Sequence, residues 1–94
     1  MRIEWLLEAS QDLVEIRNFI AADRPSTAAK VAKRILDTVA YLSEHPEIGR
    51  KGRIPGTREL IIPGLPYIVP YRVKGGMIEI LGVLHTAQEW PKEL

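Results

Sequence analysis

Four side chains in the second half of this 94-residue chain are of types that bind or cleave a phosphodiester: Arg58, Arg72, Glu79 and His85. Acid–base cleavage of RNA needs a base, an acid and cations gathered around one phosphate. His85 lies six residues beyond Glu79, which is about 20 Å along an extended strand. This spacing argues against one shared catalytic centre. It favours a cross-strand ion pair for Arg72 and a hydrogen bond to a neighbouring loop for His85.

The charge of the chain is unevenly distributed. Its formal net charge is +1, from 13 basic and 12 acidic residues. Between residues 50 and 74, however, only one acidic side chain, Glu59, stands against six basic ones. These are Arg50, Lys51, Arg53, Arg58, Arg72 and Lys74. A basic segment on a nearly neutral chain fits an anionic partner, and it fits equally a solvated loop that keeps the chain soluble.

The chain lacks the residues that several other kinds of chemistry require. The absence of cysteine excludes disulfides and thiol catalysis, and it agrees with a reducing cytoplasm. Only His45 and His85 could supply imidazole ligands, and no carboxylate stands at ligand spacing, so we predict no metal. Lys74-Gly75-Gly76 lacks the strand–loop–helix context of a phosphate loop, and we expect no cofactor. No apolar run approaches the roughly 20 residues of a membrane span, and no secretory signal begins the chain. We therefore expect a cytoplasmic protein.

Residues 57–90 predict three strands that the rest of the chain covers. Gly75-Gly76 suits a two-residue hairpin loop, in which positive φ is needed. Residues 63–66, Pro-Gly-Leu-Pro, make a second reversal. The hairpin then pairs Lys74 with Met77, Val73 with Ile78, Arg72 with Glu79, Tyr71 with Ile80 and Val69 with Gly82.

Directly opposed residues point to the same side of a sheet. One side is therefore expected to carry Val69, Tyr71, Val73, Ile78 and Ile80. The other is expected to carry Ile68, Arg72, Glu79, Leu81, Val83 and His85. The last strand is apolar on both sides, which places it near the centre of the sheet. Pro70 cannot donate to a ladder, so its position must be an edge, a bulge or a gap.

The first half of the chain predicts a strand and two helices. Residues 2–7 alternate, with Ile3, Trp5 and Leu7 on one side. A helix capped by Ser10 follows and ends before Pro25, and a second begins near Ser26 and stops at residues 45–46. Their apolar stripes are Ala9, Leu13, Ile16 and Ile20 in the first, and Ala28, Val31, Ile35, Val39 and Leu42 in the second. The loop at residues 49–57 is expected to be the most exposed and mobile part. The sequence thus predicts one α+β domain over residues 1–94, in the order β-α-α-β-β-β, with a mainly antiparallel sheet.

The sequence resembles the RelE/ParE superfamily of type II toxin–antitoxin toxins across nearly its whole length. The matching pieces are the first strand with Trp5, the segment ASQDLVEIRNFI, Pro25 with Ala28-Ala29, and then HPEIGRKGR, GTREL, PYIVPYRV and IEILGVLHTAQEWP. The second helix and the ending VLHTAQEW are most similar to the ParE and plasmid-stabilisation branch. The resemblance implies a toxin neutralised by a cognate antitoxin, with which it forms a hetero-oligomer. RelE-like members cut mRNA on the ribosome, whereas ParE-like members poison DNA gyrase.

Four departures separate this chain from the nuclease pattern. RelE-like nucleases carry basic residues where this chain has Glu59, Ile61 and Pro63, and an arginine where it has Gln88. An RNA phosphate is not neutralised by such a set. Arg58, Arg72 and His85 match positions common in the ParE branch. The target-binding residues that we predict are Arg50, Lys51, Arg53, Arg58, Arg72, His85, Gln88 and Trp90.

We therefore interpret the chain as a toxin that acts by binding DNA gyrase rather than by catalysis. The alternative is a ribosome-dependent mRNA endoribonuclease, whose candidate residues would be His85, Arg58 and Arg72, with Arg50, Lys51 and Arg53 as further cations. A third interpretation is a decayed toxin that binds only its antitoxin. We expect the antitoxin to cover the exposed apolar residues of the helical hairpin and a sheet edge near Pro70.

Overall fold

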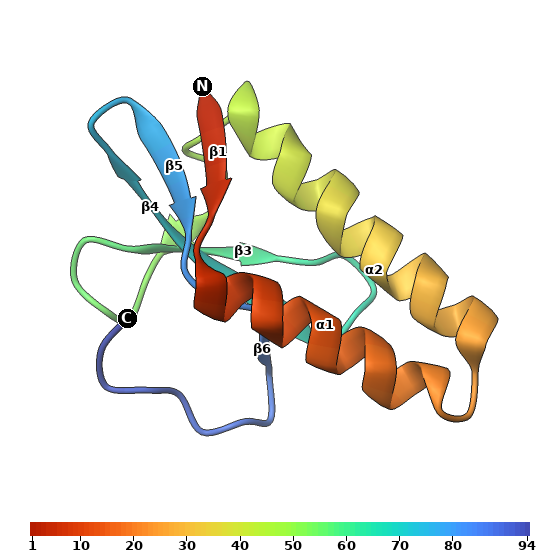
Figure 1. The fold of residues 1–94 in the computed structure, drawn as a ribbon. Helices are drawn as coiled ribbons and strands as arrows, with labels where there is room; N and C mark the ends of the chain where they lie inside the picture. The colour runs from red at the N-terminus through yellow and green to blue at the C-terminus, as the bar shows by residue number, and fades with distance from the viewer.

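Two helices lie against one face of a six-stranded mixed sheet in the computed structural model, which describes residues 1–94 (Figure 1). The elements in chain order are β1 (Arg2–Trp5), α1 (Leu7–Ala21), α2 (Pro25–Ala40), a 3₁₀ turn η1 (Tyr41–Ser43), β2 (Arg50–Lys51), β3 (Arg58–Ile61), β4 (Tyr67–Lys74), β5 (Met77–Ile80) and β6 (Leu84–His85). The predicted α+β class is confirmed. The two-residue strand β2 was not predicted, and the last strand, predicted to run on to His85, is divided into β5 and β6. Neither helix has the length and apolar character that crossing a membrane requires.

The first helix begins earlier than predicted. β1 ends at Trp5, and α1 starts at Leu7 behind Leu6, whose backbone is extended and whose side chain makes no cap. Ser10 already lies in the first turn, where its N–H donates to Leu6 O at 3.1 Å, so its predicted capping role is wrong. Leu7 is 67% exposed and does not continue the buried side of the strand. The apolar stripe predicted for this helix does pack on the core.

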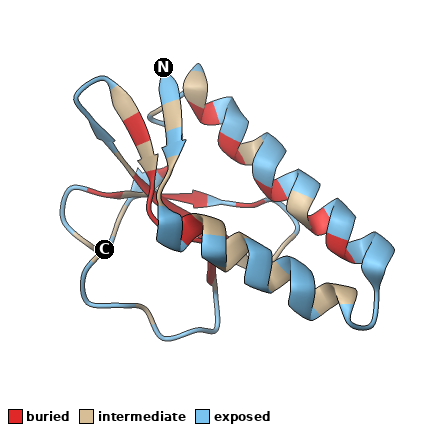
Figure 2. Ribbon diagram, in the orientation of Figure 1, coloured by how far each residue is buried: buried red, intermediate tan, exposed pale blue.

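The second helix follows the prediction closely. It begins at Pro25, where the missing N–H is harmless because the first helical N–H groups have no intrahelical partner. Its predicted stripe of Ala28, Val31, Ile35, Val39 and Leu42 is buried throughout. Figure 2 shows this stripe facing the sheet, with exposed residues on the outer side of the helix. Each fully buried aliphatic side chain contributes about 1.5–3 kcal/mol, so these stripes hold the helices on the sheet.

The sheet order is β1-β5-β4-β3-β2, with β1 parallel to β5 and every other pair antiparallel. β5 therefore lies inside the sheet, as its two apolar sides indicated. The hairpin register is confirmed, with Tyr71 opposite Ile80 and Arg72 opposite Glu79. Gly75 and Gly76 have φ of 59° and 75°, as a tight two-residue loop demands. Val69, Tyr71, Ile78 and Ile80 face the helices and complete the core.

The register slips by one residue beyond Ile80, which corrects the predicted faces. Ile68 is opposite Leu84, and Tyr67 is opposite His85, while Gly82 belongs to no strand and does not pair with Val69. We attribute the slip to Pro70. Pro70 O still accepts a hydrogen bond from Leu81 N at 2.9 Å, but Pro70 has no N–H to donate in return, so the ladder is interrupted there. His85 therefore shares the helix-facing side with Tyr67, and Val83 joins the core. The predicted placement of both beside Arg72 and Glu79 is wrong.

The slip also fixes the position of Pro70 in the sheet. β4 has β3 on one side and β5 with β6 on the other, so Pro70 lies at an interior bulge and not at an edge. The chain's C-terminal segment, residues 86–94, continues from β6 without a helix and returns toward the loop that precedes β3 (Figure 1). Part of the sheet face opposite the helices is buried. Ile68 and Leu84 are buried on that face.

Five of the nine residues in the loop at residues 49–57 are exposed, as expected, but both ends of the loop are held by the sheet. Gly49 and Thr57 are buried, and Arg50–Lys51 pairs with β3. The Gly52 N–H donates to Thr57 O at 2.8 Å, which closes the turn between β2 and β3.

Candidate functional site

Three of the predicted target-binding residues gather around one buried carboxylate. Glu59 is only 2% exposed, and it faces Arg50 directly across the β2–β3 ladder. Arg50 donates to Glu59 Oε1 from Nε at 3.1 Å and from Nη2 at 2.9 Å. Arg53 donates to Oε2 from its backbone N at 2.9 Å and from Nε at 3.0 Å. The Arg53 guanidinium lies 3.6 Å from the ring centroid of Trp90, so the C-terminal segment closes over this cluster.

The Glu59 cluster is an electrostatically satisfied structure. Burial raises the pKa of Glu59, but the hydrogen bonds from Arg53 and then Arg50 outweigh burial, and the net pKa lies below the ordinary value. The carboxylate is therefore ionised at neutral pH, and it offsets one of the two guanidinium charges. Both arginines donate to Glu59 from Nε and Nη2, so their first role is to stabilise the fold.

Arg58 lies on the other side of the sheet from Glu59, beside a tyrosine that anchors the preceding loop. Arg58 is opposite Tyr71, and its Nη1 donates to Glu47 O at 3.2 Å and to Gly49 O at 2.9 Å. The Tyr71 hydroxyl donates to Pro46 O at 2.7 Å and accepts from Gly49 N at 2.9 Å. Burial raises the pKa of the Tyr71 phenol, and the Gly49 hydrogen bond offsets this only in part. The phenol is therefore a neutral structural brace.

A second basic group lines a hollow of about 390 Å³ at the end of the sheet where β4 finishes and β3 starts. Its walls are Lys51, Gly56, Thr57, Arg58, Arg72 and Val73. Arg72 forms the predicted cross-strand ion pair, with Nε 2.6 Å from Glu79 Oε1. This hollow brings together three of the predicted binding residues, and none of its lining residues is acidic.

His85 and Gln88 form a local turn away from both basic groups. The His85 N–H donates to Gln88 Oε1 at 3.0 Å, and His85 Nδ1 accepts from Ala87 N at 3.0 Å. The imidazole also meets Tyr67 edge to face at 5.5 Å between centroids. His85 is thus a strand-end residue bonded to its own loop. Arg72 lies five positions along β4 from the partner of His85, about 16 Å away and on the other face.

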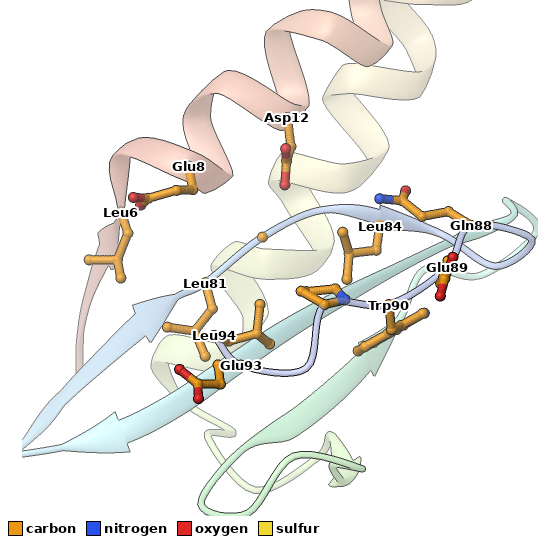
Figure 3. Close-up of a pocket in the computed structure, with 12 residues that line it drawn as sticks. Leu6, Glu8, Asp12, Leu81, Leu84, Gln88, Glu89, Trp90, Glu93 and Leu94 are labelled. Atoms are coloured by element: carbon orange, nitrogen blue, oxygen red, sulfur yellow. The ribbon is translucent and has the colours of Figure 1, made fainter.

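The largest cavity, about 740 Å³, was not anticipated from the sequence (Figure 3). Glu8 and Asp12 of α1 line one side of it, Glu89 and Glu93 of the C-terminal segment line the other, and Leu81 is among its apolar lining residues. Its four carboxylates and lack of basic lining residues make it unsuited to a phosphate.

Asp12 has a structural part at this cavity. Its Oδ2 accepts from Val83 N at 3.0 Å, in the segment between β5 and β6. Burial raises the pKa of Asp12, the Val83 hydrogen bond lowers it, and the nearby Glu15 and Glu8 raise it further, so the net pKa lies above the ordinary value. No sequence signal joins two residues so far apart in the chain.

A groove of about 480 Å³ runs between the two helices on the surface of the hairpin. Small residues of α2 form its floor, and Leu36, which is 46% exposed, stands in its wall. Charged Arg17, Lys33 and Asp37 line it as well. Val14 and Phe19 of α1 are also exposed, at 51% and 83%. The sequence predicts exposed apolar residues on the hairpin without specifying which, and the structure identifies Val14, Phe19 and Leu36 among them.

The fold and these sites define a small toxin of the RelE/ParE type. The chain belongs to the ParE toxin family of type II toxin–antitoxin systems, parDE, whose family model matches residues 3–90. It is 47% identical to Y4kP of Sinorhizobium fredii, a protein assigned as a toxin, over 99% of this chain and 96% of that protein. It is 30% identical to toxin RelE2 of Caulobacter vibrioides, over 93% and 97% of the two chains.

The solved structure of a chromosomal ParDE toxin–antitoxin system from P. aeruginosa is also similar. It has a TM-score of 0.83 and 31% identity, over 90% of this chain and 95% of that chain. The resemblance to the ParE branch that the sequence indicated is therefore confirmed.

Proposed function

We propose that this chain is the toxic component of a type II toxin–antitoxin pair, which arrests bacterial growth by binding and poisoning DNA gyrase. It acts in the cytoplasm and is neutralised by a cognate antitoxin. Membership of the ParE toxin family supports the class of protein. That the toxin acts by binding its target and not by catalysis has to be argued from the residues of the site.

The observation that carries this choice is the position of Glu59. A buried carboxylate occupies a place where the nuclease pattern has a cation, and it engages both Arg50 and Arg53. His85, the imidazole among the acid–base candidates, is separated from Arg72 and Glu79 by both distance and face. A phosphodiester held at any of these groups would lack the combination of base, acid and cations that cleavage requires.

A supercoiling assay with purified gyrase tests the proposal. We expect the purified toxin to inhibit supercoiling and to accumulate cleaved DNA, and to leave translated mRNA uncut in primer extension. The contrary pattern, with codon-phased mRNA breaks and no effect on gyrase, would establish the endoribonuclease alternative. The 30% identity to toxin RelE2 is the observation that favours this alternative. Normal growth when the chain is expressed without its partner gene would identify a decayed toxin.

The antitoxin is expected to cover the groove between α1 and α2. The similar solved structure is that of a ParDE toxin–antitoxin system, which supports an antitoxin partner for this chain. The groove combines exposed apolar side chains with charged ones, as a binding surface for a protein segment requires. The sheet edge near Pro70 is withdrawn from this surface because Pro70 is interior. A Leu36→Glu exchange should weaken antitoxin binding at least tenfold by titration calorimetry, while the exposed-face control Lys30→Glu should not. Equal loss in both variants would place the antitoxin elsewhere.

A further inference from the structure

The three cations of the end-of-sheet hollow retain hydrogen-bond donors that nothing in the protein uses. Lys51 is exposed, and its Nζ makes no hydrogen bond or ion pair within the protein. Arg72 spends Nε on Glu79, and its two terminal nitrogens have no acceptor. Arg58 spends Nη1 on two carbonyl groups, which leaves Nε and Nη2. Arg50 and Arg53, by contrast, direct two nitrogens each to Glu59.

The ladder opposes two of these cations directly. Lys51 is paired with Arg58 across β2 and β3, so their side chains leave the sheet on the same side. Like charges in directly opposed positions destabilise a sheet by a few tenths of a kcal/mol or more. No acidic residue lines the hollow to relieve this repulsion. An anion bound between the two side chains would relieve it.

Gly56 adds a backbone donor and open space to the same hollow. Its N–H finds no acceptor in the structure, and its φ of 79° lies in the left-handed region. A Cβ at this position would meet nothing within 4 Å, so the approach to the hollow is open there. Free backbone N–H groups in such turns commonly contact anions.

The basic group continues along β4 beyond the hollow. Arg72 and exposed Lys74 are two residues apart in one strand, so they point to the same side about 7 Å apart. That side is the face opposite to Lys51 and Arg58, because Arg58 is paired with Tyr71 and not with Arg72. A single carboxylate would occupy only one of these positions. The cations therefore surround the end of the sheet from both faces, and this arrangement fits a ligand that carries several negative charges.

We propose that Lys51, Arg58 and Arg72 bind the phosphodiester backbone of nucleic acid, with Lys74 contacting the next phosphate. The choice of duplex DNA as the nucleic acid rests on the proposed function, since gyrase works on DNA. The contacts are to phosphate oxygens and therefore read no base sequence. The hollow would thus let the toxin hold DNA beside the enzyme that it inhibits.

Fluorescence anisotropy of the full chain with a labelled DNA duplex tests the proposal. We expect Lys51→Gln and Arg72→Gln each to weaken binding about threefold to tenfold at low salt, and to reduce the slope of log K against log salt by about 1. The matched control is Lys30→Gln, which removes the same charge from the exposed face of α2. An equal loss in the control, or wild-type protein that binds no duplex, would overturn the proposal.

Lys51→Glu separates binding from folding. The new carboxylate would face Arg58, so the melting temperature should rise by about 2 °C or more, while DNA affinity falls at least tenfold. A loss of both stability and affinity would show that the lysine acts through the fold and would contradict the proposal. Inorganic pyrophosphate should raise the wild-type melting temperature and leave that of Lys51→Glu unchanged. Stabilisation by pyrophosphate without duplex binding would assign the hollow to a free phosphate compound and overturn the nucleic-acid ligand.

The same variants keep this inference apart from the proposed function. If wild type inhibits gyrase and Lys51→Glu inhibits it equally, the DNA contact is wrong while gyrase poisoning stands. If wild type binds DNA through the hollow but does not affect gyrase, the phosphate site stands and the proposed target is wrong.

Discussion

The Glu59 cluster and the end-of-sheet hollow are built from one basic segment, yet they differ in what their cations can still do. Arg50 and Lys51 are adjacent in β2, and the pleat sends them to opposite sides of the sheet. Arg50 meets Glu59, whereas Lys51 meets Arg58. Arg50 is therefore paired with a carboxylate, whereas Lys51 is paired with another cation. Whether a basic residue is available to a ligand depends on its ladder partner and on how many of its nitrogens that partner engages: Glu59 takes two nitrogens of Arg50, whereas Glu79 takes only Nε of Arg72. A count of charges along the sequence does not reveal this.

Removing the carboxylate should have the largest effect, because it converts the satisfied cluster into an unsatisfied one. Glu59→Gln leaves Arg50 and Arg53 together on a buried neutral amide. Both guanidinium groups are about half exposed, so water offsets part of the cost. We expect a loss of about 2–3 kcal/mol in the free energy of unfolding, measured with urea.

The matched control for that exchange is Glu79→Gln, which breaks the ion pair of Arg72 at the hollow. That pair is more accessible on its acidic side, at 18% for Glu79 against 2% for Glu59. We expect a loss of about 1 kcal/mol or less. Equal losses in the two variants would mean that the contrast between the two basic groups has no energetic basis.

Tyr71→Phe should have the next largest effect, since it removes the brace that holds the loop beneath Arg58. The hydroxyl serves both Pro46 O and Gly49 N in a buried position, so both partners lose their hydrogen bond. We expect a loss of about 1–2 kcal/mol. Amide hydrogen exchange should show faster exchange at Gly49, with Gly52 as the internal reference. Unchanged exchange at Gly49 would contradict the bracing role.

The hairpin and helix stripes could be predicted because local chemistry determines them. Gly75-Gly76 fixes the loop, the loop fixes the pairing of Arg72 with Glu79, and helical spacing fixes which residues of α2 are buried. The slip beyond Ile80 could not be predicted. The missing N–H of Pro70 signals a break in the ladder but not whether it is an edge, a bulge or a gap.

The sites were less predictable than the fold for a related reason. β2 has two residues, too few to show any alternation, so the sequence could not say that Arg50 and Lys51 diverge. Asp12 and Val83 meet only through tertiary packing. Trp90 is a single aromatic residue in a polar ending, and nothing local shows that it lies on Arg53.

Acid should affect the Glu59 cluster in a defined direction. The folded pKa of Glu59 lies below its ordinary value of 4.5. Its ionised form therefore stabilises the fold fully above that value, and this stability is lost as the pH falls through the lower folded pKa. Asp12 works in the opposite sense: its folded pKa is raised, so the folded state binds a proton more readily than the unfolded chain, and stability rises as the pH falls through that pKa. Urea unfolding from pH 6 down to about pH 3 should therefore show a loss in wild type that is smaller in Glu59→Gln. If the free energies of unfolding of the two proteins depended on pH in the same way, Glu59 would not contribute to the loss of stability in acid.

The smallest expected effect concerns the C-terminal segment that closes over the Glu59 cluster. Trp90→Leu keeps an apolar side chain at this position but removes the aromatic ring that Arg53 stacks on. A cation–π contact at a partly exposed site contributes about 0.5–1 kcal/mol, so global stability should fall by no more than that. The more sensitive readout is the Arg53 Nε–H resonance, which should move and exchange faster with water, whereas the Arg72 Nε–H should not. Arg53 should remain hydrogen-bonded to Glu59 after the ring is removed, so the affinity for duplex DNA should also remain unchanged. A gain in DNA affinity would instead show that Trp90 masks a cation which the protein can release, and the Glu59 cluster would then belong with the hollow as a binding surface.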